Sequence, residues 1–251
     1  MSDTLTGLDI RPLSDALGAE IRGVDLSQPM DDVTAAEIRD AWHEHIVLLF
    51  RNQDISEDQQ VTFAEKFGVV GTRSRPASRR PEGADYNASI MLVSNIKENG
   101  EYIGSLPDGE MWFHHDMCYD PAPHKGTFLY AMELPSSGGN TLFANMYMAY
   151  DALDDDLKAR IQGLAALQIY DFATRETVDI SGDIAQYKHC VQPVTVTHPI
   201  TERRALYVNP LITARIEGVP ERESRVMLDE LFAFADNRDI VYEHEWRIGD
   251  V

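Results

Sequence analysis

Residues Met111–Tyr119 read MWFHHDMCY, a His-x-Asp core with aromatic and apolar residues on both sides. This composition favours an extended strand over a helix. Successive side chains of a strand point to opposite faces, so we expect His114 and Asp116 on one face and His115 on the other. An imidazole and a carboxylate on one face can bind a single metal ion. A histidine from elsewhere would complete the two-His-one-carboxylate triad of non-haem Fe(II) sites.

The His-x-Asp pattern is a weak signal for a metal when it stands alone. Its commoner explanation is a polar pair that is hydrogen-bonded within a sheet. Patterns elsewhere in the chain are therefore needed to choose between a metal site and a hydrogen-bonded pair.

The overall composition limits the class of protein. The net charge of −20, from 42 acidic and 22 basic residues, argues against binding to nucleic acid or to an anionic membrane and is most simply explained by solubility. No apolar run approaches the length of a membrane span, and the first residues lack the basic and apolar segments of a secretory signal. Cys118 and Cys190 are too few for a disulfide framework, which favours a reducing, cytoplasmic location.

The first third of the chain is expected to be scaffold. Asp31 or Asp32 can cap a helix that runs to about His45, and the apolar run 46–50 predicts a buried strand. Ser56 and Gln59 form the pattern of a capping box, which predicts a second helix that Gly68 ends.

Residues 71–110 are rich in loop-forming residues, with one strand expected over 90–94. Long loops in a compact domain are often binding lids. Arg73 and Arg75 add local positive charge to a very acidic chain. They belong either to a solvated loop or to a surface that steers an anionic substrate, and the sequence favours neither.

The later residues predict more short strands and peripheral helices. Strands are expected over 125–133 and 141–145 around the turn at Gly138–Gly139, and a hairpin over 191–209. Helices are expected from Asn145 or Asp151 and from Pro220. This pattern predicts a mostly β fold with flanking helices around a double-stranded β-helix (jelly-roll) core, in a single domain that spans residues 1–251.

Together with the His-x-Asp core, the segment Gly-Gly-Asn-Thr-Leu at 138–142 resembles the TauD/TfdA family of Fe(II)- and 2-oxoglutarate-dependent oxygenases. The resemblance extends in order along nearly the whole chain. It includes Ile10–Leu13, Gly18–Leu26, His45–Arg51, Phe67–Gly68, Thr197–Pro199, Leu206–Asn209 and Trp246–Asp250.

This resemblance implies a mechanism and a set of site residues. His114 and Asp116 would be two of the three Fe(II) ligands. 2-Oxoglutarate would chelate the metal, and Thr141 with an arginine near the C-terminus would hold its distal carboxylate. Reaction with O2 would release succinate and CO2 and hydroxylate a C–H bond of a small molecule. Because Asp116 is a carboxylate rather than a small residue, hydroxylation is expected rather than halogenation.

The resemblance also implies residues beyond those given. In the family, the segment after Trp246–Asp250 continues into a Trp-Asp-Asn-Arg strand, then to the distal histidine ligand and the arginine. We therefore expect the third ligand beyond Val251, in a segment that the given sequence does not include. The competing possibility is a naturally short chain that binds metal weakly.

The substrate-binding residues are less well defined. Where family members carry a substrate-binding histidine, this chain has Arg73-Ser74-Arg75, which suits a carboxylate through bidentate guanidinium contacts. Glu110 and Trp112 flank the metal motif and complete the candidate set, although core packing is the simpler explanation for Trp112. Thr141 has a simpler explanation too, since threonine is common on strands.

The remaining histidines are given structural roles. His115 is expected to be packed or solvent-facing rather than a ligand, and His198, which precedes a proline, is expected in a turn. His124, His189 and His244 are expected on the surface.

Two other functions compete with a cytoplasmic oxygenase that acts on a small anionic molecule without nucleic-acid or membrane partners. One is a catalytically silent binding protein on the same fold. The other is a Zn(II) hydrolase, for which Glu110 is the only nearby candidate for a general base. The resemblance is compatible with a homo-oligomer, since relatives commonly self-associate.

Overall fold

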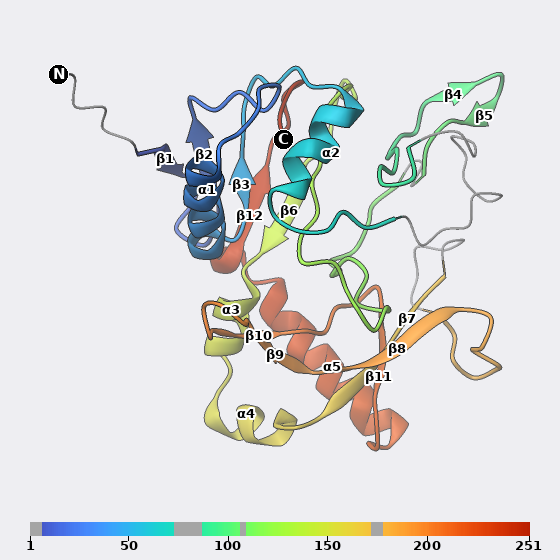
Figure 1. The fold of residues 1–251 in the computed structure, drawn as a ribbon. Coiled ribbons are helices and arrows are strands. Elements are labelled where there is room, and N and C mark those ends of the chain that lie inside the picture. The colour runs from blue at the N-terminus through green and yellow to red at the C-terminus, as the bar shows by residue number, and fades with distance from the viewer. Residues whose placement is uncertain (1–6, 73–86, 106–108, 172–177) are drawn as a thin grey trace.

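The computed structural model describes residues 7–72, 87–105, 109–171 and 178–251. These ranges contain short strands in several small sheets, with helices around them (Figure 1). No helix in them is long and apolar enough to cross a bilayer.

The N-terminal part combines a three-stranded sheet with two helices. Strand β1 (Asp9–Pro12) pairs antiparallel with β2 (Ala19–Arg22), which pairs in parallel with β3 (Leu48–Leu49). Helix α1 (Asp32–His45) begins where the Asp31 side chain accepts a hydrogen bond from the Thr34 amide. Both expected helix starts are confirmed, because α2 (Glu57–Glu65) carries the complete Ser56/Gln59 capping box.

The strand expected over 46–50 is shorter than predicted. Ile46 ends α1 in a positive-φ conformation (φ 71°), so the regular strand begins only at Leu48. The chain then meets the C-terminal segment, where the backbones of Phe50 and Val251 exchange two hydrogen bonds of 2.9 Å. Both residues belong to one apolar core together with Ile38, Phe63 and other side chains of α1 and α2.

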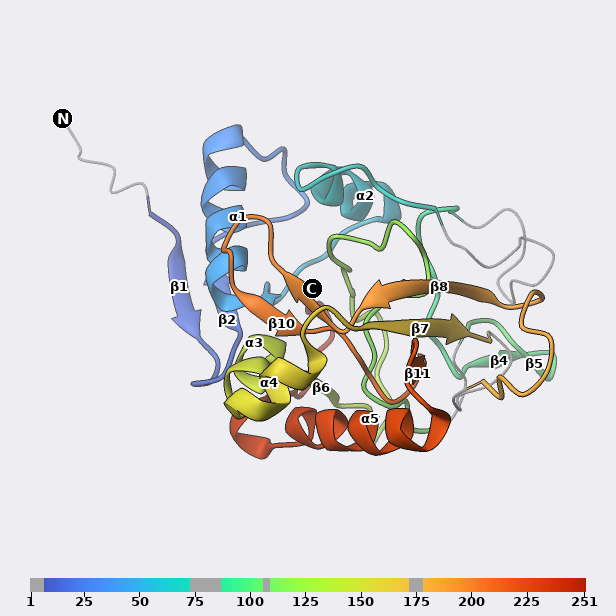
Figure 2. The ribbon, with the colours of Figure 1, turned by 90° about the horizontal axis from the view of Figure 1, so that it is seen from below.

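A second core lies in the lower half of Figure 1. Helices α3 (Met146–Asp151) and α4 (Asp155–Ile161) follow β6 (Thr141–Ala144), so the single helix expected there is divided in two. A sheet of order β11 (Thr213–Ile216), β7 (Ala165–Tyr170) and β8 (Lys188–Pro193) carries helix α5 (Glu221–Ala235) alongside β11 (Figure 2). Leu228 and Leu231 of α5 are buried against Ala166 and Ile216 of this sheet.

Two further pairings complete the described fold. Strands β9 (Thr195–Thr197) and β10 (Arg204–Leu206) form the hairpin expected over 191–209. The 3-10 helix η2 (Arg238–Ile240) leads into β12 (Val241–His244), which pairs antiparallel with β6 although about a hundred residues separate them in the chain.

Two of the expected strands outside the His-x-Asp segment are contradicted by the structure. Residues 125–133 form no regular strand, although Ala131 exchanges backbone hydrogen bonds with Gly249 and Asp250. In place of a strand over 90–94 there is a single bridge from Val93 to Ser105. The regular pairing lies further on, between β4 (Lys97–Glu98) and β5 (Glu101–Tyr102). In both segments the described backbone contacts are too few to extend into a regular ladder.

Candidate functional site

The side chains of His114 and Asp116 converge at one point. The Nε2 atom of His114 lies 3.2 Å from Oδ1 of Asp116. The other ring nitrogen, Nδ1, lies 2.9 Å from the carbonyl oxygen of Trp112, so an Nδ1–H donates to that oxygen and Nε2 is the nitrogen that faces Asp116. A backbone partner of this kind is typical of metal-binding histidines, because it fixes both the tautomer and the ring orientation.

Asp116 is also held from a second side. The Thr127 hydroxyl donates a 2.8 Å hydrogen bond to Oδ2 of Asp116, while Oδ1 faces His114. Both side chains remain partly open to solvent, with 34% of His114 and 49% of Asp116 exposed. A neutral imidazole nitrogen and a supported carboxylate oxygen at one accessible point fit an Fe(II) ion.

The backbone that carries this pair is not the expected strand. Residues 111–115 belong to no sheet, and residues 116–119 form a turn in which Met117 has a positive φ of 59°. The Asp120 amide closes the turn on the Met117 carbonyl at 2.8 Å. The prediction of a strand was therefore wrong, because a tight turn and not a ladder brings Asp116 back toward His114.

His115 nevertheless points away from the pair, as expected. Its ring packs edge-on to Tyr207, with centroids 4.9 Å apart. Its Nδ1 lies 3.4 Å from the side-chain amide nitrogen Nδ2 of Asn209. Burial and then the nearby charge of His114 lower the pKa of His115 to about 4. A neutral, packed histidine is a structural support for the motif.

The electrostatics of the pair follow from its hydrogen bonds. Burial opposes a charged His114, but the hydrogen bonds to Asp116 and to the Trp112 carbonyl outweigh burial and raise the pKa of His114. The hydrogen bond from His114 lowers the pKa of Asp116, against the opposing effect of burial. In the metal-free protein the pair therefore favours a proton between its partners, and a bound cation would take that proton's place.

Within the residues that the structure describes, no three His, Cys, Asp or Glu side chains are grouped closely enough to hold a metal ion. His114 and Asp116 thus account for two ligands of a site. A third ligand beyond Val251 remains a prediction.

Thr141 begins strand β6 and lies opposite His244 of β12 in the antiparallel register. Its hydroxyl accepts a 2.9 Å hydrogen bond from the indole nitrogen Nε1 of Trp246. Trp246 follows β12 by two residues, and no pattern in the sequence connects it with Thr141.

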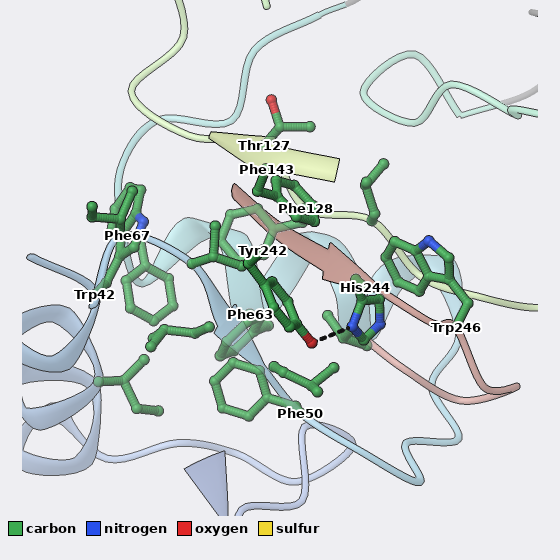
Figure 3. Close-up of a pocket in the computed structure, with 17 residues that line it drawn as sticks. Trp42, Phe50, Phe63, Phe67, Thr127, Phe128, Phe143, Tyr242, His244 and Trp246 are labelled. Carbon is green, nitrogen blue, oxygen red and sulfur yellow. Dashed lines mark hydrogen bonds between the residues drawn. The ribbon is translucent and has the colours of Figure 1, made fainter. Parts of the chain in front are cut away.

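An apolar cavity of about 150 Å³ has Thr127 and Trp246 among its lining residues (Figure 3). Aromatic side chains such as Trp42, Phe50 and Tyr242 form much of its wall. Two of its other lining residues reach the candidate site, because Thr127 is bonded to Asp116 and Trp246 is bonded to Thr141.

His244 is buried and not on the surface as expected. Only 3% of it is exposed, its Nδ1 lies 2.9 Å from the Tyr242 hydroxyl, and its Nε2 lies 3.2 Å from Oδ2 of Asp250. Asp250 is completely buried and also accepts a 2.6 Å hydrogen bond from Arg51. Burial lowers the pKa of His244 despite the raising effect of Asp250. The neutral ring then donates from Nε2 to Asp250 and accepts at Nδ1 from Tyr242.

The only sequence signal for this burial is the alternation in β12, where Tyr242 and His244 share one face. His124 and His189 are exposed, as expected. His198 is confirmed as a turn residue, because its Nδ1 accepts hydrogen bonds from the amides of Ile200 and Thr201.

Of the four candidate substrate residues, the structure describes two. Arg73 and Arg75 lie outside the described residues. Glu110 is exposed, and Trp112 is 48% exposed, so the core-packing explanation for Trp112 is not supported. Neither residue lines the apolar cavity.

Comparison with known proteins extends the resemblance seen in the sequence. The family model described as "Taurine catabolism dioxygenase TauD, TfdA family" matches residues 9–251. Pentalenolactone F synthase of Streptomyces avermitilis is 37% identical over 254 residues, which cover 94% of this chain and 82% of the relative. The (S)-phenoxypropionate/alpha-ketoglutarate-dioxygenase of Sphingobium herbicidovorans is 32% identical over 252 residues, which cover 96% of this chain and 84% of the relative.

Solved structures agree with these relatives. The crystal structure of AAD-2 in complex with Mn(II) and N-oxalylglycine matches with a TM-score of 0.75 at 29% identity, over 97% of this chain and 85% of that one. A taurine dioxygenase from Burkholderia xenovorans matches with a TM-score of 0.76 at 26% identity, over 97% of this chain and 78% of that one.

Proposed function

This chain belongs to the taurine catabolism dioxygenase TauD, TfdA family, and we propose that it is an Fe(II)- and 2-oxoglutarate-dependent dioxygenase that hydroxylates a C–H bond of a small anionic molecule. In this reaction O2 is consumed, 2-oxoglutarate is converted to succinate and CO2, and the substrate gains a hydroxyl group. The observation that carries the proposal is the convergence of His114 Nε2 and Asp116 Oδ1 at 3.2 Å in a chain of this family.

His114 and Asp116 are proposed as two metal ligands, with a histidine beyond Val251 as the third. A bound Fe(II) would supply the activation of O2 that no protein side chain provides. The chain's own residues hold the ligands in place. The Trp112 carbonyl fixes the His114 ring, and the Thr127 hydroxyl fixes the Asp116 carboxylate.

Thr141 is proposed to donate a hydrogen bond to the distal carboxylate of 2-oxoglutarate, with an arginine beyond Val251 as the ion-pair partner. Its support is the match of residues 138–142 to the family pattern and its position at the start of β6.

An anionic substrate is proposed on two grounds. Relatives are named for phenoxypropionate and for 2,4-dichlorophenoxyacetate, both of which are carboxylates. In a chain with a net charge of −20, Arg73 and Arg75 are a rare source of local positive charge, and Glu110 and Trp112 are further candidates near the ligands. Other relatives are named pentalenolactone F synthases, so the names of similar proteins do not agree on one substrate.

The same proposal includes the domain organisation, the location and the assembly of the chain. The chain is proposed to form a single domain on a jelly-roll core, to act in the cytoplasm and to self-associate. The dioxygenase names of the relatives favour this function over a silent binding protein and over a zinc hydrolase.

The test is succinate formation from 2-oxoglutarate by the full-length protein, with and without Fe(II), across a panel of small carboxylic acids. We expect Fe(II)-dependent succinate that rises with one group of acids. The absence of succinate with every acid, from a protein that is folded and binds Fe(II), would contradict the proposal and return the silent binding protein as the better explanation.

A further inference from the structure

The hydrogen bond between Trp246 and Thr141 has a direction that the chemistry of the two groups dictates. An indole N–H can only donate, whereas a hydroxyl has one proton to donate and two lone pairs that accept. Thr141 therefore accepts from Trp246 at 2.9 Å, and its own proton must point elsewhere. Among the described residues no acceptor for that proton is found, so the hydroxyl is left ready to donate to a ligand.

The pairing of β6 with β12 produces this contact. Thr141 lies directly opposite His244, and Trp246 follows the end of β12 by two residues, from where its indole reaches the Thr141 hydroxyl. A diagonal neighbour across an antiparallel pair is within reach of a long aromatic side chain. The contact thus follows from the strand register and not from a mobile side chain.

The indole ring is itself held in place. The ring of His244 packs edge-on against it, with centroids 4.4 Å apart and an interplanar angle of 89° (Figure 3). His244 cannot turn freely because Tyr242 and Asp250 bond its two nitrogens, and Arg51 bonds Asp250. A line of contacts from Arg51 to Trp246 therefore fixes the direction from which Thr141 receives its hydrogen bond.

From this geometry we infer that Trp246 is a positioning residue for 2-oxoglutarate. Its N–H occupies a lone pair of Thr141 and turns the threonine proton toward the distal carboxylate of the co-substrate. The inference rests on the proposed function, because it requires Thr141 to bind 2-oxoglutarate.

The experiment measures binding of N-oxalylglycine to the full-length Mn(II)-loaded protein by titration calorimetry, so that no turnover is needed. Trp246→Phe removes the N–H and keeps an aromatic ring, and Thr141→Ala removes the hydroxyl. The two changes are also combined in one protein. Trp42→Phe is the matched control, because Trp42 lines the same cavity without bonding to Thr141. Thermal unfolding checks that all four variants fold.

We expect Trp246→Phe to weaken N-oxalylglycine binding by about two- to tenfold, as the loss of one hydrogen bond between neutral groups would. The double variant should bind as weakly as Thr141→Ala alone, because Trp246 acts only through that hydroxyl. In turnover, Trp246→Phe should raise the KM for 2-oxoglutarate and leave kcat nearly unchanged. Trp42→Phe should bind like the unaltered protein.

Two results would overturn the inference alone. One is a Trp246→Phe protein that binds normally while Thr141→Ala binds weakly. The other is a double variant whose loss is the product of the two single losses, which would mean that Trp246 acts independently of Thr141. Normal binding by Thr141→Ala would be a different failure, since it would remove Thr141 from the co-substrate site and the inference with it.

Discussion

The molecule contains two histidine–aspartate pairs with the same separation and opposite properties. His114 and Asp116 approach to 3.2 Å, and so do His244 and Asp250. The side chains of His114 and Asp116 are 34% and 49% exposed, whereas those of His244 and Asp250 are 4% and 0% exposed. The pKa of His114 is raised because its hydrogen bonds outweigh burial, while the pKa of His244 is lowered because burial outweighs its bond to Asp250.

The difference lies in exposure and in the number of bonds that converge on one carboxylate oxygen. Both nitrogens of His244 are bonded, and Oδ2 of Asp250 also accepts from the side chain of Arg51 and from the amide of Arg247. In the first pair, each side chain has one supporting bond and turns its other atom toward its partner. A His–Asp pair is therefore suited to a metal only where its lone pairs are exposed and unclaimed, and it serves as structural support where they are not.

The largest effect is expected from the exposed pair. Asp116→Ala should reduce Fe(II)-dependent succinate formation to background, because it removes a ligand, and should change the stability of the metal-free protein little, because the residue is half exposed. Succinate assays and thermal unfolding measure the two effects. His115→Ala is the control and should retain metal binding. A loss equal to that of His114→Ala would show that the ligand has been assigned to the wrong histidine.

The buried pair should respond in the opposite way. Arg51→Met leaves Asp250 completely buried without its cationic partner, and we expect it to lower the free energy of unfolding by about 3–5 kcal/mol. Arg22→Met breaks the exposed pair with Glu20 and should change the free energy of unfolding far less, because solvent screens an exposed ion pair. Denaturant unfolding compares the two variants. Equal losses would contradict the structural role assigned to the Asp250 cluster.

Thr141 connects the two regions, since it lies in register with His244 and is proposed to bind the co-substrate. Thr141→Ala should raise the 2-oxoglutarate requirement by an amount equivalent to about 1.5–3 kcal/mol, the range for a hydrogen bond to a charged group. Thr141→Ser keeps the hydroxyl and should recover most of this loss. An unchanged KM in Thr141→Ala would leave this threonine with a structural role only.

The smallest effect concerns pH. The folded-state pKa of His244 is below its ordinary value of 6.5, so the unfolded chain binds the proton more readily. His244 should therefore destabilise the metal-free protein as pH falls through about 6.5 toward the lower folded-state pKa. The folded-state pKa of His114 is raised, so protonated His114 stabilises the fold at low pH. This stabilisation is lost as pH rises through the folded-state pKa of His114.

Unfolding midpoints at pH 7.5 and at pH 5.5 test this contrast. His244→Gln should show a smaller loss of stability on acidification than the unaltered protein, and His114→Gln a larger one. Identical pH dependence of the unfolding midpoint in both variants would contradict the opposite pKa shifts of His114 and His244.

Sequence reasoning succeeded where the causes are local. The starts of α1 and α2 depend on side chains within three residues, namely Asp31, Ser56 and Gln59, and all three cap as predicted. The positions of the turn at His198 and of the helix after Pro220 have equally local causes. The family also came from short patterns in a fixed order along the chain, and the same patterns predict His114, Asp116 and Thr141 as site residues.

The failures share a different cause. The strand expected at 111–119 is absent because a strand needs a partner ladder, and whether one is present depends on distant segments. His244 was expected on the surface because the alternation in β12 does not show which of its faces is covered, although both partners of the His244 ring, Tyr242 and Asp250, are near it in the chain. The Arg51 side chain that completes this cluster is 199 residues from Asp250.

The sequence by itself therefore determined the family, the helix starts and the identity of the candidate ligands, since each depends on residue types at short spacing. Only the tertiary structure decided which His–Asp pair stays accessible and that Trp246 reaches Thr141. Burial and strand register arise from contacts between segments that are far apart in the chain, and short spacing carries no information about them.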